Sequence, residues 1–460
     1  MPINFILKFT GIRREETGAA LLSSLLFFVI LCGYYMVRSL REEMGLAGGV
    51  RNLPWLYLAN LGVMLALAPV FGAVATRWAR RTFVPGIFLF FMSNMLVFFI
   101  LMKTLPESAD ILLGRVFYIW ISVYNMWAVS LFWAFMADGF GLERSKRLFG
   151  FIAVGGTAGA ILGAGFTALL VDVVGRANII LVSAVFMLIA AVIFRRLGLL
   201  LGLTRGSATT DSAPKAGPSP DRGSALSGIK EFLGSRYLLA IGLYLFLFTL
   251  ASTFLYFEQA EIVDAAAATR EAKTRIFASI DLWVNILTLF AQIFLTGRLI
   301  ATWGVGRVLL ILPAITLIGF TTLGLAPILP VLVVFQVLRR AGNYALAKPA
   351  RETLYTILDR DQKYKAKSFI DTFVYRGGDM LGASAFAALG SLGIGLSGIA
   401  FVAAPPALLW GAVGLFLGRK QNQLAASTIY QDHSFKRPGG IAKSNIDPGQ
   451  QGESNESKQT

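Results

Sequence analysis

Cysteine and histidine are almost missing from this sequence, and their scarcity excludes several kinds of chemistry. Among 460 residues there is one cysteine, Cys32, and one histidine, His433. A single cysteine cannot form a disulfide within the chain. One histidine in a polar C-terminal stretch cannot supply a metal centre or a general base within the apolar part of the chain. We therefore expect no metal site and no cofactor, and an enzyme is the least expected class.

Charged residues are also scarce. They make up 15% of the chain, whereas 56% of the residues are hydrophobic and the mean hydropathy is +0.66. Soluble proteins have about 25% charged residues, so this composition indicates a protein with many membrane spans. The net charge of +16 comes from basic residues spread over short loops, not from one basic domain, so we expect no nucleic-acid partner.

A phosphate-binding Gly-x-x-x-x-Gly-Lys-Ser/Thr loop is absent from the sequence. Transport by this protein would therefore be driven by exchange or by an ion gradient, because the chain lacks the loop with which pumps hydrolyse ATP.

Long apolar stretches are abundant and fall into two sets of six. A helix needs about 20 apolar residues to cross a bilayer. The twelve predicted spans are Gly18–Val37, Leu53–Ala75, Thr82–Met102, Ile111–Ala137, Leu148–Val171, Ala177–Leu197, Tyr237–Phe257, Ile276–Gly297, Val308–Leu325, Ile328–Lys348, Ser368–Leu389 and Gly395–Leu417.

The spans predict an all-α fold with two six-helix bundles, at residues 18–198 and 236–418. Residues 1–17 form a predicted cytoplasmic segment, 199–235 a linker rich in Ser, Ala, Pro and Gly, and 419–460 a disordered tail. Basic clusters fall on alternate sides of successive spans, which predicts that both termini are cytoplasmic. The lipid bilayer is thus one expected partner of the chain, which we expect to be a monomer.

The two halves contain short internal echoes, which are typical of transporters built from related repeats. Gly72 and Trp78 follow the second span with the same spacing as Gly297 and Trp303 after the eighth span. A Phe-x-x-x-Gly-Gly sequence begins at Phe151 and again at Phe373. The offsets between the copies are 225 and 222 residues.

The loop after the second span resembles the signature of the major facilitator superfamily, Gly-x-x-x-Asp-Arg-x-Gly-Arg-Arg. The matching residues are Gly72, Arg77, Arg80 and Arg81. Thr76 stands where the family has an acidic residue, and Ala79 where it has the second glycine. The resemblance implies two bundles that rock about a central site, with Arg77 and Arg81 in gating roles.

Further segments look similar to the ATP/ADP translocase group and its bacterial relatives. They are Lys348–Tyr355, Tyr364–Asp371, Tyr375–Asp379, Tyr34–Glu42 and Leu148–Ile152. This resemblance implies a transporter in a bacterial inner membrane that exchanges a nucleotide for another nucleotide or for phosphate. Another phosphorylated or carboxylated solute is the rival substrate.

One predicted span has basic and aromatic residues on a single helical stripe. At about 100° per residue, the stripe contains Arg340, Tyr344, Lys348, Arg351 and Tyr355, with Asn343 at its margin. Arginine and lysine bind phosphate oxygens, and a tyrosine ring can stack on a base. The substrate contacts predicted from this span are Arg340, Asn343, Tyr344, Lys348 and Arg351.

Two alternatives remain open for this stripe. Lys348 and Arg351 would also be explained as interfacial anchors that extend to the cytoplasmic surface. Arg340 is harder to explain in that way, since it lies ten residues after Pro330, or about 15 Å into the membrane. A charge at that depth faces a cavity or a partner.

The eighth and eleventh spans supply the predicted coupling and gating residues. Asp281, Asn285 and Gln292 lie on one polar face of the eighth span, where Asp281 either pairs with an arginine or binds a coupling cation. Arg376 and Asp379 are close enough along the eleventh span to form an ion pair.

Charges near the outer end of the first span suggest an outer anion funnel, in which Arg38 is a further substrate contact. Glu258 in the seventh span is predicted to pair with Arg38 or Arg41 and to form an outer gate. Snorkelling explains the arginines nearly as well. The combined prediction is a secondary transporter of a small anionic, phosphorylated solute. Two alternatives stay open: proton-coupled transport of a non-nucleotide organic anion, and a transport-inactive scaffold or sensor.

Overall fold

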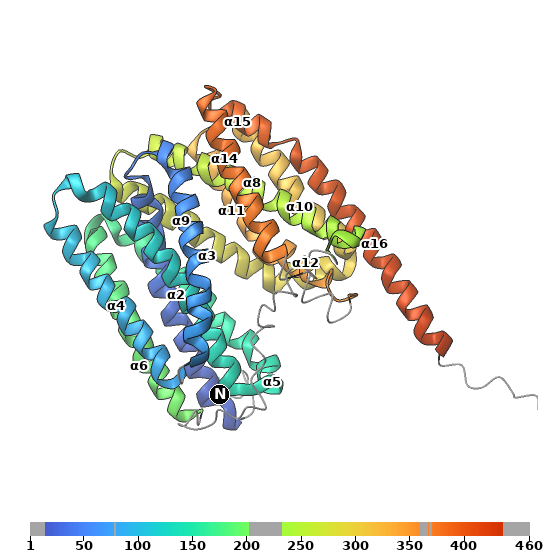
Figure 1. The fold of residues 1–460 in the computed structure, drawn as a ribbon, viewed down its shortest axis with the longest axis horizontal. Coiled ribbons are helices and arrows are strands. Elements are labelled where there is room, and N and C mark those ends of the chain that lie inside the picture. The colour runs from blue at the N-terminus through green and yellow to red at the C-terminus, as the bar shows by residue number, and fades with distance from the viewer. Residues whose placement is uncertain (1–13, 78–79, 202–231, 359–366, 368–369, 436–460) are drawn as a thin grey trace, which may run out of the picture.

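The computed structural model describes residues 14–77, 80–201, 232–358, 367 and 370–435, and all regular structure within these ranges is helical (Figure 1). Eight helical stretches in the described part are long and apolar enough to cross a membrane. This agrees with the predicted all-α membrane fold and is consistent with twelve spans. The side chains of Arg77 and Arg81, which were predicted to be gating residues, lie outside the described part of the chain.

Five long helices form the first half. They are α2 (Thr17–Leu46), α3 (Leu53–Arg77), α4 (Arg80–Thr104), α5 (Asp110–Val174) and α6 (Arg176–Leu200). The helix α5 includes both the fourth and the fifth predicted spans, because helical structure continues through the loop expected between them. Its two apolar parts, Asp110–Phe140 and Leu148–Val174, are each long enough to cross a bilayer.

The second half has shorter elements. They are α8 (Arg236–Ala266), α9 (Arg270–Ala291), η4 (Gln292–Thr296), α10 (Gly297–Leu325), α11 (Leu329–Gly342), η5 (Asn343–Ala347), α12 (Lys348–Thr353), η6 (Ile370–Val374), α14 (Tyr375–Ser391), α15 (Leu396–Ala403) and α16 (Pro406–Phe435). The elements η4, η5 and η6 are π-helical turns.

Two boundaries differ from the sequence-based expectation. The chain turns between the eighth and ninth spans at Gly304, whose positive φ of 76° suits glycine, so the assigned helix α10 contains a break. The helix α16 continues to Phe435. The start of the tail, predicted to be disordered from residue 419, is therefore helical.

A glycine stripe holds α5 against α2. A Cβ atom added at Gly155, Gly159 or Gly163 would lie 2.2–2.3 Å from a backbone carbonyl oxygen of α2. No side chain fits at that separation, so the backbones of the two helices are in direct contact. In the second half, Gly378 and Gly382 of α14 also face α8, but there the nearest atoms to an added Cβ belong to the side chains of Thr249 and Thr253, and the nearest backbone carbonyl oxygens lie at 3.1 and 3.4 Å. The internal repeat thus reflects equivalent helix pairs.

The two halves meet near the end of the molecule where α9 begins and diverge toward the end that holds the N-terminus (Figure 1). One hydrophobic cluster contains residues of both halves, among them Leu46 and Leu53 of the first half and Phe257 and Phe320 of the second. The other two clusters each lie within one half. Apolar packing of this cluster therefore joins the halves at that end of the molecule.

Candidate functional site

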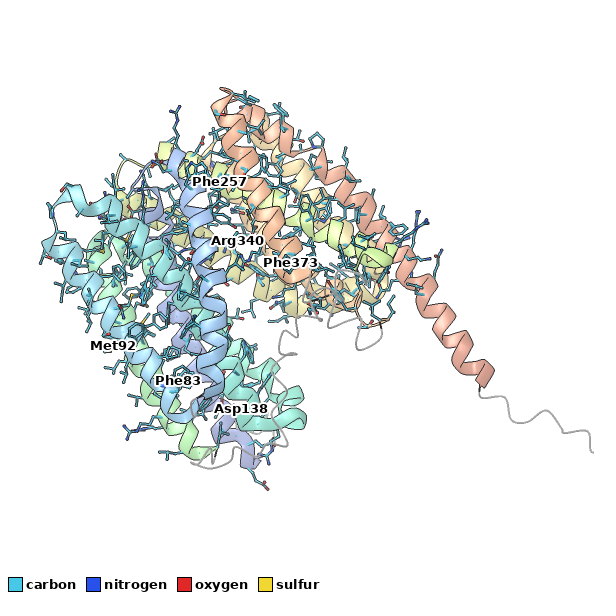
Figure 2. The ribbon with its side chains drawn as sticks, viewed as in Figure 1. Phe83, Met92, Asp138, Phe257, Arg340 and Phe373 are labelled. Carbon is cyan, nitrogen blue, oxygen red and sulfur yellow. The ribbon has the colours of Figure 1, made fainter. Side chains whose placement is uncertain are left out.

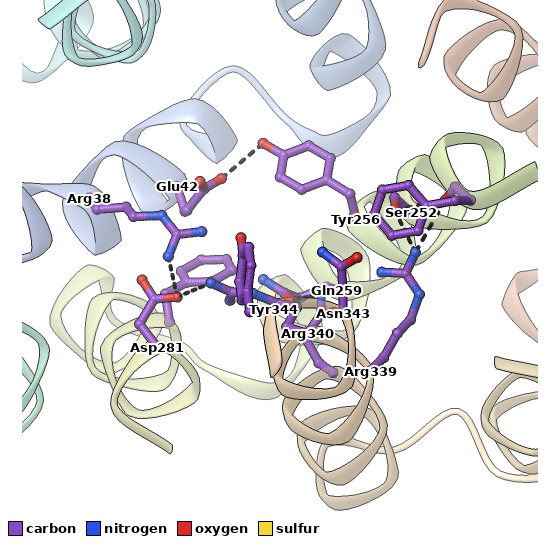
Figure 3. Close-up of a pocket in the computed structure, with 13 residues that line it drawn as sticks. Arg38, Glu42, Ser252, Tyr256, Gln259, Asp281, Arg339, Arg340, Asn343 and Tyr344 are labelled. Atoms are coloured by element: carbon purple, nitrogen blue, oxygen red, sulfur yellow. Dashed lines mark hydrogen bonds and ion pairs between the residues drawn. The ribbon is translucent and has the colours of Figure 1, made fainter. Parts of the chain in front are cut away.

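A cavity of about 190 Å³ lies between the two halves (Figure 3). The elements α2, α8, α9, α11 and η5 form its wall. Its lining residues are Arg38, Glu42, Phe248, Ser252, Tyr256, Gln259, Phe277, Asp281, Gln336, Arg339, Arg340, Asn343 and Tyr344. We call it the central cavity, and Figure 2 places Arg340 near the junction of the two bundles.

Asp281 lies between two arginines that come from opposite halves. Its Oδ1 accepts a hydrogen bond from Nη1 of Arg38 in α2 at 2.5 Å and forms an ion pair with Nη2 of Arg340 in α11 at 2.7 Å (Figure 3). The Asp281 side chain is 5% exposed. The contact with Arg38 is a charge-assisted hydrogen bond, which is about twice as strong as a neutral one. One carboxylate oxygen therefore ties the two halves together inside the cavity.

A π-helical turn shapes the wall beside Arg340. Asn343 and Tyr344 begin η5, and both line the cavity. The turn is held from the neighbouring π-helical turn η4, where Thr296 donates to the carbonyl of Ala345 at 2.7 Å and Gln292 to that of Tyr344 at 3.4 Å. Isolated π-helical turns are frequent at functional sites. Gln292 thus supports the site from behind and is absent from its lining.

Arg339 is a cavity residue that the sequence-based set of contacts did not include. Its side chain is buried, donates to the Ser252 hydroxyl and to the carbonyl of Phe248 at 3.3 Å, and lies 5.4 Å from the centre of the Phe248 ring. The sequence contained a signal for it, because two adjacent arginines deep in an apolar span cannot both face lipid.

Tyrosines and a carboxylate close another side of the cavity. The Tyr256 hydroxyl donates to Oε2 of Glu42 at 2.9 Å and lies 2.8 Å from the hydroxyl of Tyr118. Arg41 donates to the other oxygen of Glu42 at 3.1 Å. Glu42 belongs to the first half and Tyr256 to the second, so this network also joins the halves.

Besides Gln292, three more of the predicted residues do not line the central cavity. Lys348 is exposed and does not line it. Arg351 is buried, and its guanidinium carbon lies 5.4 Å from the ring centre of Phe248, which lines the cavity. Asn285 lies one helical turn after Asp281, and its side chain donates to the Asp281 backbone carbonyl at 2.8 Å.

The predicted pair of the eleventh span is present but loose. Nη1 of Arg376 lies 3.7 Å from Oδ2 of Asp379. Asp379 also accepts a hydrogen bond from the Thr253 hydroxyl at 3.3 Å, so it links α14 to α8. Arg376 itself lines a second cavity, described below.

The expected outer gate between Glu258 and Arg38 or Arg41 is not formed. Arg38 pairs with Asp281, and Arg41 pairs with Glu42. Glu258 is fully buried, and neither of its carboxylate oxygens has a hydrogen-bond partner among the described residues. The reason is rotation along the helix, since Glu258 lies about 200° around α8 from the cavity residue Tyr256.

Ion pairs at the junction of the halves replace the expected gate. We call this set of charges the junction cluster. Its pairs are Glu43–Arg176 at 3.0 Å, Glu43–Arg270 at 3.7 Å, Asp110–Arg270 at 2.7 Å, Arg176–Glu271 at 3.1 Å and Asp172–Arg275 at 2.5 Å. Four of the five connect the first half to the second. They lie at the predicted outer end and join the two halves there.

Comparison of sequences identifies one family. The model of the Major Facilitator Superfamily matches residues 11–266, more than half of the chain. No curated protein matches the sequence.

Solved structures with a similar fold include three transporters. The bacterial homologue of the iron transporter ferroportin, in its inward-facing state, has a TM-score of 0.62 at 15% identity and covers 88% of this chain and 98% of its own. An autoinhibited peptide transporter of the POT family has a TM-score of 0.57 at 13% identity, with 88% and 96% covered. A mutant of the nucleoside transporter NupG has a TM-score of 0.55 at 13% identity, with 88% and 99% covered.

Proposed function

The chain belongs to the Major Facilitator Superfamily, and from that premise we propose that it is a secondary transporter of a small phosphorylated anion. The transport cycle would be alternating access about the central cavity. The observation that carries the proposal is the position of Asp281, which is shared by Arg38 and Arg340 from opposite halves.

The charge of the cavity wall supports an anionic substrate. The lining contains three arginines, at positions 38, 339 and 340, and two carboxylates, at positions 42 and 281. Arginine forks bind phosphate and carboxylate oxygens through paired N–H groups. A substrate anion would therefore take the place of the Asp281 carboxylate between Arg38 and Arg340.

The size of the cavity favours a small solute. Pockets that enclose ligands of drug size have volumes of about 300–1,000 Å³, whereas this cavity has about 190 Å³. A phosphorylated or carboxylated metabolite of a few carbon atoms suits this conformation. A nucleotide, with Tyr344 stacked on its base, would need the halves to separate further. The resemblance to the ATP/ADP translocase group keeps nucleotide exchange as the larger-substrate form of the proposal.

Glu258 favours a second candidate function, proton-coupled transport of an organic anion. A buried carboxyl group within a membrane span is a candidate proton carrier. Movement of α8 that exposed Glu258 to water would allow the proton to leave. If this candidate is right, Glu258→Gln abolishes uptake driven by a pH gradient but retains exchange of substrate for substrate. Loss of both activities in that variant would exclude this role.

The proposed site implies a location and an assembly. We propose that the protein lies in a bacterial inner membrane as a monomer, with both termini in the cytoplasm. The junction cluster would then close the periplasmic side of the cavity, and the structure would be open toward the cytoplasm.

Ligand-dependent thermal stabilisation tests the proposed function. Purified protein would be heated with ATP, ADP, inorganic phosphate, sugar phosphates or dicarboxylates, since a ligand at 100 times its Kd stabilises by about 2.7 kcal/mol. We expect one of these anions to raise the Tm, and Arg340→Gln to abolish the rise. Arg298→Gln is the matched control, because Arg298 is an exposed arginine of α10 outside the cavity.

Two outcomes would contradict the proposal. If none of the anions raises the Tm and none is transported by proteoliposomes, the scaffold or sensor alternative takes its place. If an anion stabilises the wild type and the Arg340→Gln variant equally, the binding site lies elsewhere.

A further inference from the structure

A second cavity of about 190 Å³ lies between the halves and is formed by α2, α3, α5 and α14. Its lining residues are Tyr34, Arg41, Tyr57, Asn60, Leu61, Met64, Ser122, Asn125 and Arg376. The first half contributes all of them except Arg376. None of them lines the central cavity, so the two cavities have distinct linings.

The lining of the second cavity contains two arginines and no carboxylate. Each arginine has a carboxylate neighbour outside the lining, because Arg41 contacts Glu42 at 3.1 Å and Arg376 approaches Asp379 at 3.7 Å. The separation of 3.7 Å is too long for a hydrogen bond. Both arginines therefore line a wall that holds no carboxylate of its own, with the Arg41 guanidinium carbon also 4.2 Å from the ring centre of Tyr118.

Two buried polar atoms on this wall lack partners within the described part of the chain. They are Nε of Arg41, a donor, and Oδ1 of Asn60, an acceptor. Asn60 is 8% exposed. Leaving such atoms unpaired is costly, more so where the group is charged. Both atoms are buried, so a ligand would reach them after a small rotation of the two side chains, and it would then supply an anionic oxygen to Arg41 and a hydrogen-bond donor to Asn60.

We infer that the second cavity is a second anion-binding site, which takes a phosphate or carboxylate group that has a hydroxyl or N–H donor beside it. This inference rests on the proposed function for one point only, the anionic class of the ligand. The residues of the second cavity are different from those of the central cavity. Singly protonated inorganic phosphate has both features, because it has anionic oxygens and one O–H.

The two cavities are neighbours. Arg41 lines the second cavity, and its carboxylate partner Glu42 lines the central one. The ring centres of Tyr57 and Tyr256, one from each lining, are 5.6 Å apart. Two sources of the second anion are consistent with this arrangement, namely the other end of a substrate with two anionic groups, or a separate counter-anion.

Isothermal titration of the full-length protein with inorganic phosphate tests the inference. We expect two phosphates per chain in the wild type. Asn60→Asp places a carboxylate in the second cavity and should lower affinity there at least tenfold, which leaves one phosphate. Asn125→Asp is a second variant of the same design, in case Asn60→Asp does not fold. Asn52→Asp is the matched control, because Asn52 is exposed and outside both cavities.

The outcomes separate this inference from the proposed function. A phosphate that is lost in Arg340→Gln but unchanged in both aspartate variants would overturn the second site and leave the proposed function standing. A phosphate that is lost in the aspartate variants but unchanged in Arg340→Gln would support the second site and contradict the proposed role of the central cavity.

Fructose 1,6-bisphosphate distinguishes the two sources of the anion. If one substrate spans both cavities, it binds with one molecule per chain, and its affinity falls in both Arg340→Gln and Asn60→Asp. If the second anion is separate, only Arg340→Gln weakens its binding. If Arg340→Gln and Asn60→Asp both bind fructose 1,6-bisphosphate with the affinity of the wild type, neither cavity binds this compound.

Discussion

Asp281 occupies the place that a substrate anion would take, and this has a consequence for the empty protein. Its carboxylate neutralises Arg38 and Arg340 when no anion is bound. In Asp281→Asn the two arginines lose that partner, and breaking a buried ion pair costs about 3–5 kcal/mol. We therefore expect a lower Tm without ligand and a larger rise of the Tm with phosphate.

The exposed pair of Glu352 and Lys367 provides the control for this prediction. Glu352→Gln removes a carboxylate from a surface pair worth about 0–1 kcal/mol. It should change neither the Tm nor the response to phosphate. A smaller phosphate response in Asp281→Asn than in the wild type would contradict the role of Asp281 as an internal competitor.

Lys348 and Arg340 should differ in their effect on transport, although both were predicted as contacts. Lys348 is exposed and outside the cavity, whereas Arg340 lines it. We expect Lys348→Gln to change the apparent affinity for the transported anion less than twofold, and Arg340→Gln to reduce it at least tenfold. Uptake into proteoliposomes measures both. Equal losses would mean that the cavity extends to Lys348 in another conformation.

The sequence indicated the span that contributes most arginines to the central cavity, but not the full set of lining residues. Arg340, Asn343 and Tyr344 were placed by depth and helical spacing, and all three line the cavity. Lys348 was placed by the same spacing of about 100° per residue. The π-helical turn η5 has i→i+5 hydrogen bonds and a wider turn, so the residues after it leave the stripe. No local pattern announced that turn.

At the level of elements, the contact of α5 with α2 allows a sharp test. Gly159→Ala adds a Cβ that would lie 2.2 Å from the carbonyl oxygen of Phe28, so the helices must move apart. Overpacking of this kind costs about 1–3 kcal/mol. Gly150→Ala in the same helix meets nothing within 4 Å, and it should gain up to about 1 kcal/mol from helix propensity.

Thermal unfolding in detergent measures both alanine variants. We expect the Tm to fall in Gly159→Ala and to stay constant or rise in Gly150→Ala. If both variants have the Tm of the wild type, then α5 and α2 can separate freely, and the glycine stripe has no structural role.

The apolar stretches predicted the helices themselves well, because span length is fixed by the bilayer. The continuity of α5 through the loop between two spans could not be predicted, since polar residues such as Arg144 are compatible with either helix or loop. The break at Gly304 was equally hidden, because a glycine in an apolar run has many possible roles.

At the level of the whole molecule, we expect the junction cluster to determine which side of the central cavity is closed. Glu43 is 2% exposed and contacts both Arg176 and Arg270. In Glu43→Gln both arginines lose a buried carboxylate, so the closed state should lose about 3–5 kcal/mol. We expect the population to shift toward a state that is open at the junction.

Cysteine labelling measures that shift, because Cys32→Ala removes the single native thiol. In that background, Gln259→Cys places a thiol in the central cavity. An impermeant reagent added from the junction side should label it faster in Glu43→Gln.

Asp172→Asn is the control for this labelling experiment, since the pair of Asp172 with Arg275 is 43% and 51% exposed and contributes little. Equal labelling rates in the wild type and Glu43→Gln would show that the cluster does not hold the junction closed. The sequence could not predict these pairs, because they join residues more than 90 positions apart, as Arg176 and Glu271 are.

The last turns of α2 have a mechanical consequence. Arg38 belongs to the central cavity, Arg41 to the second cavity and Glu43 to the junction cluster. The first and the last of these, Arg38 and Glu43, are five positions apart, or about 7.5 Å along a helix. A translation or rotation of this one segment would thus change both cavities and the junction cluster at the same time. The end of α2 is therefore suited to couple ligand binding to the relative movement of the two halves.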